Sequence, residues 1–560
     1  MFSSRFRWAI FALVTVAACA VLAAPASARN AYVANSGDGT VSVLNLSTGA
    51  PAATIPVESA PSDVAITPNG AVAYVTNTGS DSVSVISTAS NSVVATVSLA
   101  VGSMPKGIAI SPDGQTAWVA NSGDDTVSVI FTDTNTLSGG PIALPTGAMP
   151  DGIAISPDGS AAYVAQQGND VSIVNAATRA IVGTVPDTMG PSRISLGPRG
   201  GRAFVTDNRV GSTSVTAFNP ANGAVIGGPI PVGATPSGIA IAPSGVFAYA
   251  AALGADTVTP IATSTSAASP PIGGFDDPAG VAIAPDGAHG YVANSGGASI
   301  SAFSTSTNTV VGGIGAGAAP SGLAIAPNQG PSAAFIVTPQ RRLAKRRLNF
   351  VAGASSDPDG TVANYAWDWG DGKRAQGSQT RRWHRYVSPG VYTVTLTVTD
   401  NEGCSSEVVF TGQTASCVGT PAAVTSRTIA VIDPNGPVLR LAGGLRQRLR
   451  GRVNVFARCP REACSVRAKG VVVTKTKQRG EVKRDKRWLT PSRIASAYPS
   501  WRKLGLGVRR GVRLAIIRAI RSGGKATAKL RIIARDATGQ RTLRTRTVKL
   551  VFPRTRPNRR

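Results

Sequence analysis

A motif that recurs along the first 330 residues constrains the fold more than any other feature of this 560-residue chain. Each copy begins with a proline, which is followed by an apolar stretch, a turn, and a second apolar stretch that contains an aromatic residue. Successive prolines are 41 to 45 residues apart. A fixed period of this length indicates a stacked or radial array of similar units. The prolines are Pro61, Pro105, Pro150, Pro191, Pro236, Pro278 and Pro320.

The pattern within one copy predicts β-structure throughout. In the copy that starts at Pro105, we expect strands at 107–110, 117–121 and 127–130, and a weaker fourth strand before the next proline. A Pro-Asp-Gly turn at 112–114 joins the first two, because proline presets φ and glycine accepts a positive φ. Four short antiparallel strands in about 40–50 residues are typical of one blade of a β-propeller.

The two halves of the repeat are out of phase, which predicts how the array closes. The repeat region begins with a second strand, around Tyr32, and ends with a first strand at 323–325. If these two strands pair, seven complete blades form a closed ring and no blade is left half-built. We therefore predict a seven-bladed propeller over residues 29–330. The aromatic positions of the second strands are Tyr32, Tyr74, Trp118, Tyr163, Phe204, Tyr249 and Tyr291.

The repeat resembles the YVTN family of β-propeller repeats, which is similar to lactonase-type propellers. Residues 73–77 read Ala-Tyr-Val-Thr-Asn and contain the family's signature. The resemblance implies an exported or cell-surface protein. It also leaves open an extracellular enzyme of lactonase or glycan-hydrolase type, with its site in the central channel.

The residues of the repeat do not favour catalysis. Asp113, Asp158 and Asp286 occupy repeated turns, and a position that recurs in every blade is more often structural than catalytic. His289 occurs in one blade alone and is expected at the surface. We predict no catalytic residues and no cofactor, whereas carboxylates, His or Arg converging in the channel would favour the enzyme.

Residues 331–433 predict an immunoglobulin-like two-sheet sandwich. A strand that alternates with period two is expected at 392–400, and a Trp-rich segment at 365–372 suits a buried central strand. The segment Trp-Asp-Trp-Gly-Asp-Gly at 367–372, together with His-x-Tyr-x-x-Pro-Gly-x-Tyr at 384–392, resembles the PKD (polycystic kidney disease) domain. The resemblance implies an extracellular module for adhesion, spacing, or binding of protein or polysaccharide. Its structural motif comprises Trp367, Asp368, Gly370, Asp371, Gly372, His384, Tyr386 and Tyr392.

Two side-chain types in this region could carry chemistry. His384 belongs to the structural motif, so we interpret it as a packing residue rather than a base. Four aspartates are weak candidates for calcium ligands, although forming turns is the favoured interpretation. We therefore predict no metal site. The four are Asp357, Asp359, Asp371 and Asp400.

The N-terminus predicts export. Residues 1–28 have a basic start, an apolar stretch and an Ala-Ser-Ala cleavage site, which are the parts of a secretory signal peptide. The alternatives are a retained membrane anchor and a bacterial lipobox, in which Cys19 would be acylated. The four remaining cysteines favour two local disulfides in an oxidising compartment, Cys404–Cys417 and Cys459–Cys464, over a zinc site.

The net charge of +27 is concentrated in one part of the chain. Residues 30–330 have a net charge of −11, residues 331–433 of +3, and residues 434–560 of +32. In this last region we predict a β-rich, sandwich-like domain, with strands at 453–457, 471–473, 529–534 and 547–551. A basic amphipathic helix is expected at 508–521, either lying on an anionic membrane or packed on the sandwich with its arginines in water.

The sequence therefore predicts an all-β protein, in which a seven-bladed β-propeller is followed by a PKD sandwich and a basic C-terminal β-rich domain. We expect a secreted or cell-surface binding and structural protein that is not an enzyme. Residues 434–560 would bind an anionic cell-envelope polymer or a membrane surface, and the propeller and PKD surfaces would bind protein or polysaccharide. Nucleic acid is disfavoured because the protein is expected to be exported.

Overall fold

The structure is a computed structural model that describes residues 29–551, apart from 169, 187, 189, 210, 340–341, 433–437, 449–450, 461–462, 498–499 and 537–538. It divides into two compact units. The first contains the repeat region to Gln329 together with two later segments, Pro358–Thr361 and Val409–Cys417. The second contains the rest of the chain. Among the described residues, no helix has the length and apolar character needed to cross a membrane.

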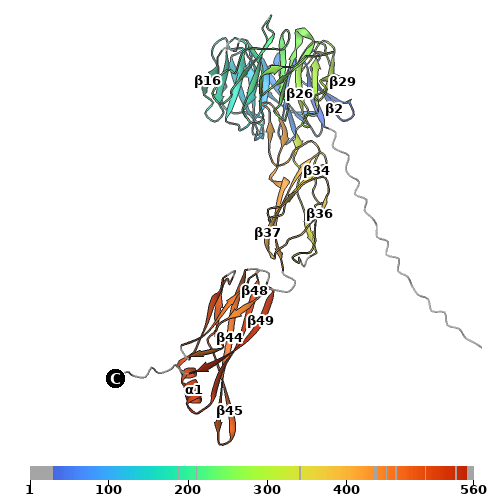
Figure 1. Ribbon diagram of the computed structural model, residues 1–560. Helices are drawn as coiled ribbons and strands as arrows, with labels where there is room; N and C mark the ends of the chain where they lie inside the picture. Colours follow the sequence, from blue (N-terminus) through green and yellow to red (C-terminus); the bar gives the residue numbers. More distant parts are fainter. Residues whose placement is uncertain are drawn as a thin grey trace, which may run out of the picture. The chain divides into compact units, whose positions relative to one another are not determined.

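Seven antiparallel sheets form the repeat region, one for each predicted blade (Figure 1). Each inner strand contacts the inner strand of the next blade, and the last contacts the first, so the ring is closed. The closure is the predicted one, because the strand that contains Tyr32 and Val33 pairs with the strand that contains Leu323 and Ala324. The inner strands are β4 (Pro61–Ile66), β8 (Pro105–Ile110), β13 (Pro150–Ile155), β17 (Pro191–Leu196), β21 (Pro236–Ile241), β26 (Pro278–Ile283) and β30 (Pro320–Ile325).

The other strands follow outward in each blade. The second strands are β5 (Val72–Asn77), β9 (Thr116–Asn121), β14 (Ala161–Gln166), β18 (Ala203–Asp207), β22 (Phe247–Ala252), β27 (His289–Asn294) and β1 (Asn30–Asn35). The third strands are β6 (Ser82–Ser87), β10 (Thr126–Phe131), β15 (Val171–Asn175), β19 (Ser214–Phe218), β23 (Thr257–Ala262), β28 (Ser299–Ser304) and β2 (Thr40–Asn45). The outer strands are β7 (Ser92–Ser98), β11 (Thr136–Leu137) with β12 (Ile142–Ala143), β16 (Ile181–Val185), β20 (Ile230–Pro231), β24 (Ala267–Ala268) with β25 (Ile272–Gly273), β29 (Thr309–Gly315) and β3 (Ala50–Pro56).

The residues of the Tyr-Val-Thr-Asn signature stabilise the ring. Asn77 Nδ2 donates to Ser82 Oγ at 3.0 Å and Ser84 Oγ at 2.9 Å, which joins the second and third strands of the blade. Asparagines in three other blades make the same pair of bonds. Tyr74 Oη donates to Asn135 Oδ1 at 2.6 Å in the next blade. The signature therefore accounts for contacts within and between blades.

Region 331–433 contains the two predicted sheets. One has the order β32 (Ile336–Thr338), β33 (Leu348–Val351), β36 (Arg381–His384), and the other the order β35 (Arg374–Ala375), β34 (Val362–Asp368), β37 (Gly390–Asp400), β40 (Val424–Val431). The core between them contains Phe350, Trp367 and Leu396, which are nearly or fully buried. A third, small sheet has the order β31 (Asn328–Gln329), β39 (Ala415–Val418), β38 (Val409–Phe410).

Residues 440–551 form a second sandwich, which confirms the predicted fold of the basic region. One sheet has the order β41 (Arg440–Ala442), β43 (Arg452–Arg458), β47 (Arg502–Gly507). The other has the order β42 (Arg446–Arg448), β49 (Arg541–Val551), β48 (Lys525–Asp536), β44 (Cys464–Gln478), β45 (Glu481–Trp488), and β46 (Ser492–Ile494) pairs with β44. Residues of both sheets share one buried core, for example Val453 and Leu504 from the first and Val466 and Ile532 from the second.

The helix α1 (Arg510–Arg521) packs on this core. Val512 and Ile516 are buried in it, whereas Arg513 and Arg518 are exposed. The apolar side of the helix therefore contacts its own domain, which is the second of the two predicted arrangements.

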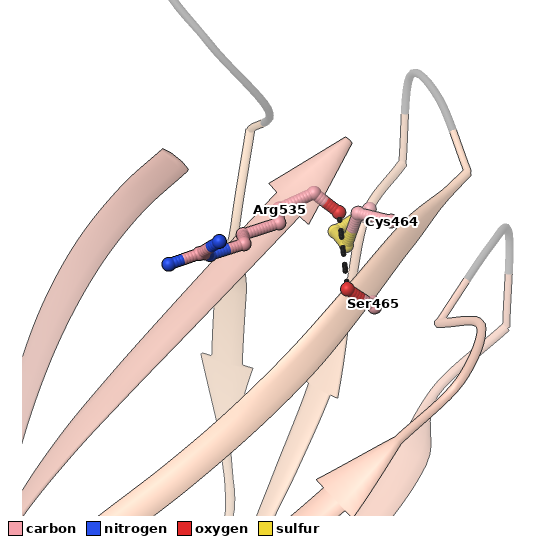
Figure 2. The surroundings of a disulfide bond; sticks show 4 residues. Cys464, Ser465 and Arg535 are labelled. Atoms are coloured by element: carbon pink, nitrogen blue, oxygen red, sulfur yellow. Dashed lines mark hydrogen bonds between the residues drawn. A yellow bond between two sulfur atoms is a disulfide. The ribbon is translucent and has the colours of Figure 1, made fainter. Parts of the chain in front are cut away.

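The disulfides agree with the sequence. Cys459 and Cys464 are bonded, with Cα atoms 6.2 Å apart. Figure 2 shows this bond at the start of β44, where Ser465 Oγ donates to the backbone oxygen of Arg535 on β48 at 3.5 Å. Cys404 and Cys417 are disulfide-bonded as well.

Candidate functional site

The inner strands of the propeller carry a repeated irregularity near their starts. In each blade the pairing of the first and second strands shifts register just after the proline of the inner strand. The second residue after the proline is glycine in five blades. In β13, for example, a Cβ on Gly152 would clash with the backbone oxygen of Ser192 in the next blade. Bulges of this kind can redirect a side chain, and only Asp63 and Arg193 carry a functional group here.

These two residues meet although their blades are separated by two others. Arg193 Nη1 lies 2.8 Å from Asp63 Oδ2. Lys106 and Asp151 come from the two intervening blades, and Lys106 Nζ lies 3.8 Å from Asp151 Oδ1. Ser192 Oγ also donates to Asp151. We call Asp63, Lys106, Asp151 and Arg193 the channel cluster.

The surroundings drive the pKa values of the two carboxyl groups in opposite directions. Asp63 and Asp151 are only 4% and 6% exposed. Burial raises the pKa of Asp63, although Arg193 and a hydrogen bond from the Val64 backbone N–H act against it. Burial also acts to raise the pKa of Asp151, but the charges of Arg193 and Lys106 and the hydrogen bonds from Ser192 and Gln167 together lower that pKa. Two carboxyl groups in such different surroundings can hold different protonation states.

A hairpin from the later sequence is hydrogen-bonded to four inner strands of the propeller. Its residues 409–417 belong to the same compact unit as the propeller. The backbone N–H groups of Leu196, Ile155 and Ile110, in three successive inner strands, donate to the backbone oxygens of 411, 412 and 413 at 3.0, 2.8 and 3.0 Å. The Ile66 N–H donates to Thr414 Oγ1 at 3.1 Å. We call this segment the inserted hairpin.

The inserted hairpin also reaches the channel cluster. The hairpin accepts hydrogen bonds from Ile66 and Leu196, which follow Asp63 and Arg193 by three residues in their strands. Three residues correspond to about 10 Å along a strand. Gln413 bridges this distance, because its Nε2 donates to Asp63 Oδ2 at 3.2 Å. The cavity left between the hairpin and the inner strands has a volume of about 70 Å³. That is room for a few water molecules, well below the roughly 300 Å³ of a typical ligand pocket.

The predicted structural motif of region 331–433 is brought together as one stack of rings. Trp367 and Trp369 are stacked with centroids 5.1 Å apart, and His384 stacks on Trp369 at 4.9 Å. His384 Nε2 lies 2.9 Å from Asp371 Oδ2, and Tyr386 Oη donates to the Trp369 backbone oxygen at 2.8 Å. His384 is 7% exposed, which agrees with a packing role.

The other members of the motif surround this stack. Tyr392 contacts Tyr386 with centroids 4.2 Å apart. Asp368 accepts a bond from the Gly370 N–H at 2.9 Å, so it shapes the turn. Gly370 and Gly372 have φ values of +71° and +84°, which glycine adopts most readily.

The four weak calcium candidates lie in different surroundings. Asp359 belongs to the first unit, where it pairs with Arg29 at 3.3 Å, while Asp357 belongs to the second. Asp371 lies against the histidine of the ring stack, and Asp400 accepts bonds from two backbone N–H groups of its own turn. Among the described residues, no group of three or more His, Cys, Asp or Glu could hold a metal ion.

The repeated turn aspartates have the predicted role. Asp113 and Asp158 accept hydrogen bonds from a serine and from a backbone N–H of their own turns, and Asp286 accepts one from a backbone N–H. His289 is exposed at the start of β27, as expected. The signal peptide at 1–28 and the alternative lipid site at Cys19 lie outside the described residues.

A groove on the C-terminal sandwich is the second candidate site. It has a volume of about 1230 Å³ and lies over β44, β46, β48 and β49. No carboxylate lines it among the described residues, and one exposed indole, that of Trp488, does. We call it the basic groove. Its cations are Arg467, Lys469, Arg493, Lys529, Arg531, Arg535 and Arg546.

Comparison with known proteins agrees with the architecture. A family model described as a PKD domain matches residues 328–414, and one described as a lactonase, 7-bladed β-propeller, matches residues 25–139. The chain carries a lactonase-like propeller and a PKD domain.

The curated relatives are similar to this chain over a short stretch. A microbial collagenase of Vibrio alginolyticus is 33% identical over 84 residues, which is 15% of this chain and 10% of that protein. Collagenase ColA of Clostridium perfringens is 37% identical over 76 residues, 14% of this chain and 7% of that protein. This chain therefore spans a tenth or less of the length of these relatives. Among solved structures, a 6-phosphogluconolactonase-like protein of Bacteroides fragilis has a TM-score of 0.44 and 18% identity, over 54% of this chain and 99% of its own.

Proposed function

We propose that this protein is an extracellular or envelope-associated binding protein, held on an anionic cell-envelope polymer by its basic C-terminal domain. The observation that carries the proposal is the distribution of charge. The last 127 residues contain 36 Lys and Arg but only 4 Asp and Glu, and seven of these cations line the basic groove, where no described carboxylate is found. Such a surface attracts polyanions.

The location is supported by independent features. Disulfide-bonded cysteines persist in oxidising compartments outside the cytoplasm. A PKD domain and the similarity to collagenases agree with an extracellular or envelope location. The propeller and the PKD domain would then present surfaces to protein or polysaccharide partners, while the basic domain provides attachment.

Cell fractionation tests this attachment. The full chain should sediment with envelope material, and a chain that ends at residue 433 should move to the soluble fraction. About 0.5 M salt should release the full chain in the same way, because it shortens the screening length to below about 5 Å. Unchanged partitioning in both experiments would refute the attachment role.

We further propose that the propeller channel does not catalyse a reaction. The channel cluster is the observation that favours the alternative, a lactonase-type enzyme. Its two carboxylates and two cations balance in charge, however, and Gln413 of the inserted hairpin occupies one side of Asp63. The test is an assay of lactone hydrolysis by the wild type and the Asp63→Asn variant. If the wild type hydrolyses a lactone and the variant does not, although its propeller still unfolds cooperatively, the protein is an enzyme.

A further inference from the structure

The basic groove contains pairs of like charges that face each other across strands. Lys469 on β44 lies opposite Arg531 on β48, and Arg467 on β44 lies opposite Arg493 on β46. Directly opposite side chains have Cβ atoms about 4.5–5.5 Å apart, and like charges at this distance repel. Because no described carboxylate lines the groove, an anion from outside the domain would relieve the repulsion.

The spacing of these cations suits an extended ligand. Alternate residues of a strand are about 7 Å apart, and neighbouring strands about 5 Å apart. Lys529, Arg531 and Arg535 continue the same face along β48. Figure 2 shows the side chain of Arg535 extending away from the disulfide at the start of β44. The groove therefore presents cations from four strands, β44, β46, β48 and β49, more than one small anion can contact.

The groove also presents an aromatic surface. Trp488, at the end of β45, is 73% exposed and lies opposite Val471, which lines the groove beside it. An indole in water is unfavourable because of its large apolar area. The flat face of the indole can cover the apolar face of a sugar ring, while the N–H at the edge of the indole can still donate a hydrogen bond. A chain of charged groups without sugars would leave this surface unused.

We propose that the basic groove binds a linear anionic polysaccharide, whose charged groups contact the cations of β44, β46 and β48 and one of whose sugars stacks on Trp488. The inference rests on the proposed function and specifies its ligand class. A lipid surface fits less well, because the cations line a groove and the apolar side of α1 is packed on the core.

Binding of the full chain to three probes tests the inference: an oligogalacturonate, inorganic polyphosphate as charge without sugar, and a DNA oligonucleotide. The double substitution Lys469→Gln with Arg531→Gln should raise the dissociation constant for oligogalacturonate about tenfold. The slope of the logarithm of the binding constant against the logarithm of the salt concentration should fall by an amount that corresponds to about two ionic contacts. The matched control is Lys475→Gln with Arg484→Gln, a like-charge pair of β44 and β45 outside the groove. It should change affinity by less than about twofold.

The role of the indole has its own test. Trp488→Ala should weaken oligogalacturonate binding roughly fivefold and leave polyphosphate binding unchanged. Trp383→Ala is the control, since Trp383 is also exposed and lies in the PKD domain. An unchanged melting temperature verifies that each variant folds.

The outcomes separate this inference from the proposed function. Envelope binding could depend on residues 434–560 and on salt while the groove double variant and the control double variant have the same affinity for oligogalacturonate. In that case the groove is the wrong site and the proposed function stands. If DNA binds more tightly than oligogalacturonate and loses affinity with Trp488→Ala, the ligand is a nucleic acid and the inference is overturned. If oligogalacturonate binds as expected but removal of residues 434–560 does not change partitioning into the envelope fraction, the proposed function is refuted and the inference about the groove stands.

Discussion

Replacement of Arg193 by methionine should destabilise the propeller strongly, because it leaves buried carboxylates without their main counter-charge. Arg193 lies 2.8 Å from Asp63, whose side chain is 6% exposed, and its charge also lowers the pKa of Asp151. Removing one partner of a buried ion pair costs about 3–5 kcal/mol. The side chain of Arg193 is 22% exposed and Asp63 keeps two other hydrogen-bond donors, so we expect about 3 kcal/mol. For a domain of this size that lowers the melting temperature by roughly 6 °C.

The loss should depend on pH in a defined direction. The pKa of Asp63 is already raised in the folded state, and without the charge of Arg193 it rises further. A carboxyl group whose folded pKa exceeds its unfolded pKa favours folding at low pH, and this contribution is lost as pH rises through the folded value. The variant should therefore be most destabilised relative to the wild type near pH 8, and less so as the pH approaches the folded pKa.

Calorimetry of the full chain at several pH values measures both effects on the propeller transition. The double variant Asp63→Asn with Arg193→Met is the matched control, because it removes the unpaired charge and should recover part of the loss. A melting temperature within about 1 °C of the wild type at every pH would refute the energetic role of the pair.

Three further substitutions test other contacts. Gly370→Ala should destabilise the PKD domain severely, because its Cβ would clash with a backbone oxygen, whereas Gly372→Ala, with open space around it, should cost only about 1 kcal/mol of left-handed strain in thermal unfolding; equal losses would contradict the clash. Tyr74→Phe removes a bond to the next blade and should cost about 1 kcal/mol in the propeller transition. Lys469→Glu should stabilise the C-terminal domain by about 0.5–1 kcal/mol, since it faces Arg531, yet weaken polyanion binding; loss of both would argue against the pairing.

The closed ring could be predicted from the sequence because it follows from the order of the repeated halves. Tyr32 comes before any first strand and Leu323 belongs to a first strand without a successor, so the two strands had to pair to complete a blade. The packing role of His384 was also predictable, because it belongs to one of two nearby segments that carry the PKD motif, 367–372 and 384–392.

The basic domain shows where such prediction stops. Four of its strands (β43, β44, β48 and β49), its helix and its disulfide could be placed from alternation, apolar spacing and cysteine order, whereas β41, β42, β45, β46 and β47 were not predicted. Which cations face one another could not, because the register of β44 against β48 and β46 depends on packing of the whole core. The groove beside Trp488 is therefore visible only in the structure.

The channel cluster could have been suspected, but not assembled, from the sequence. Aligning the repeats shows glycine at the second position after the proline in five blades, and Asp63 and Arg193 in the other two. In a repeat protein such a position is set by geometry, here by the close approach of the next blade's backbone at Gly152. A departure from it needs a compensating contact, and an acid and a base that depart together supply it to each other. The contribution of Gln413 lies beyond this reasoning, because the inserted hairpin comes from a part of the chain outside the repeat.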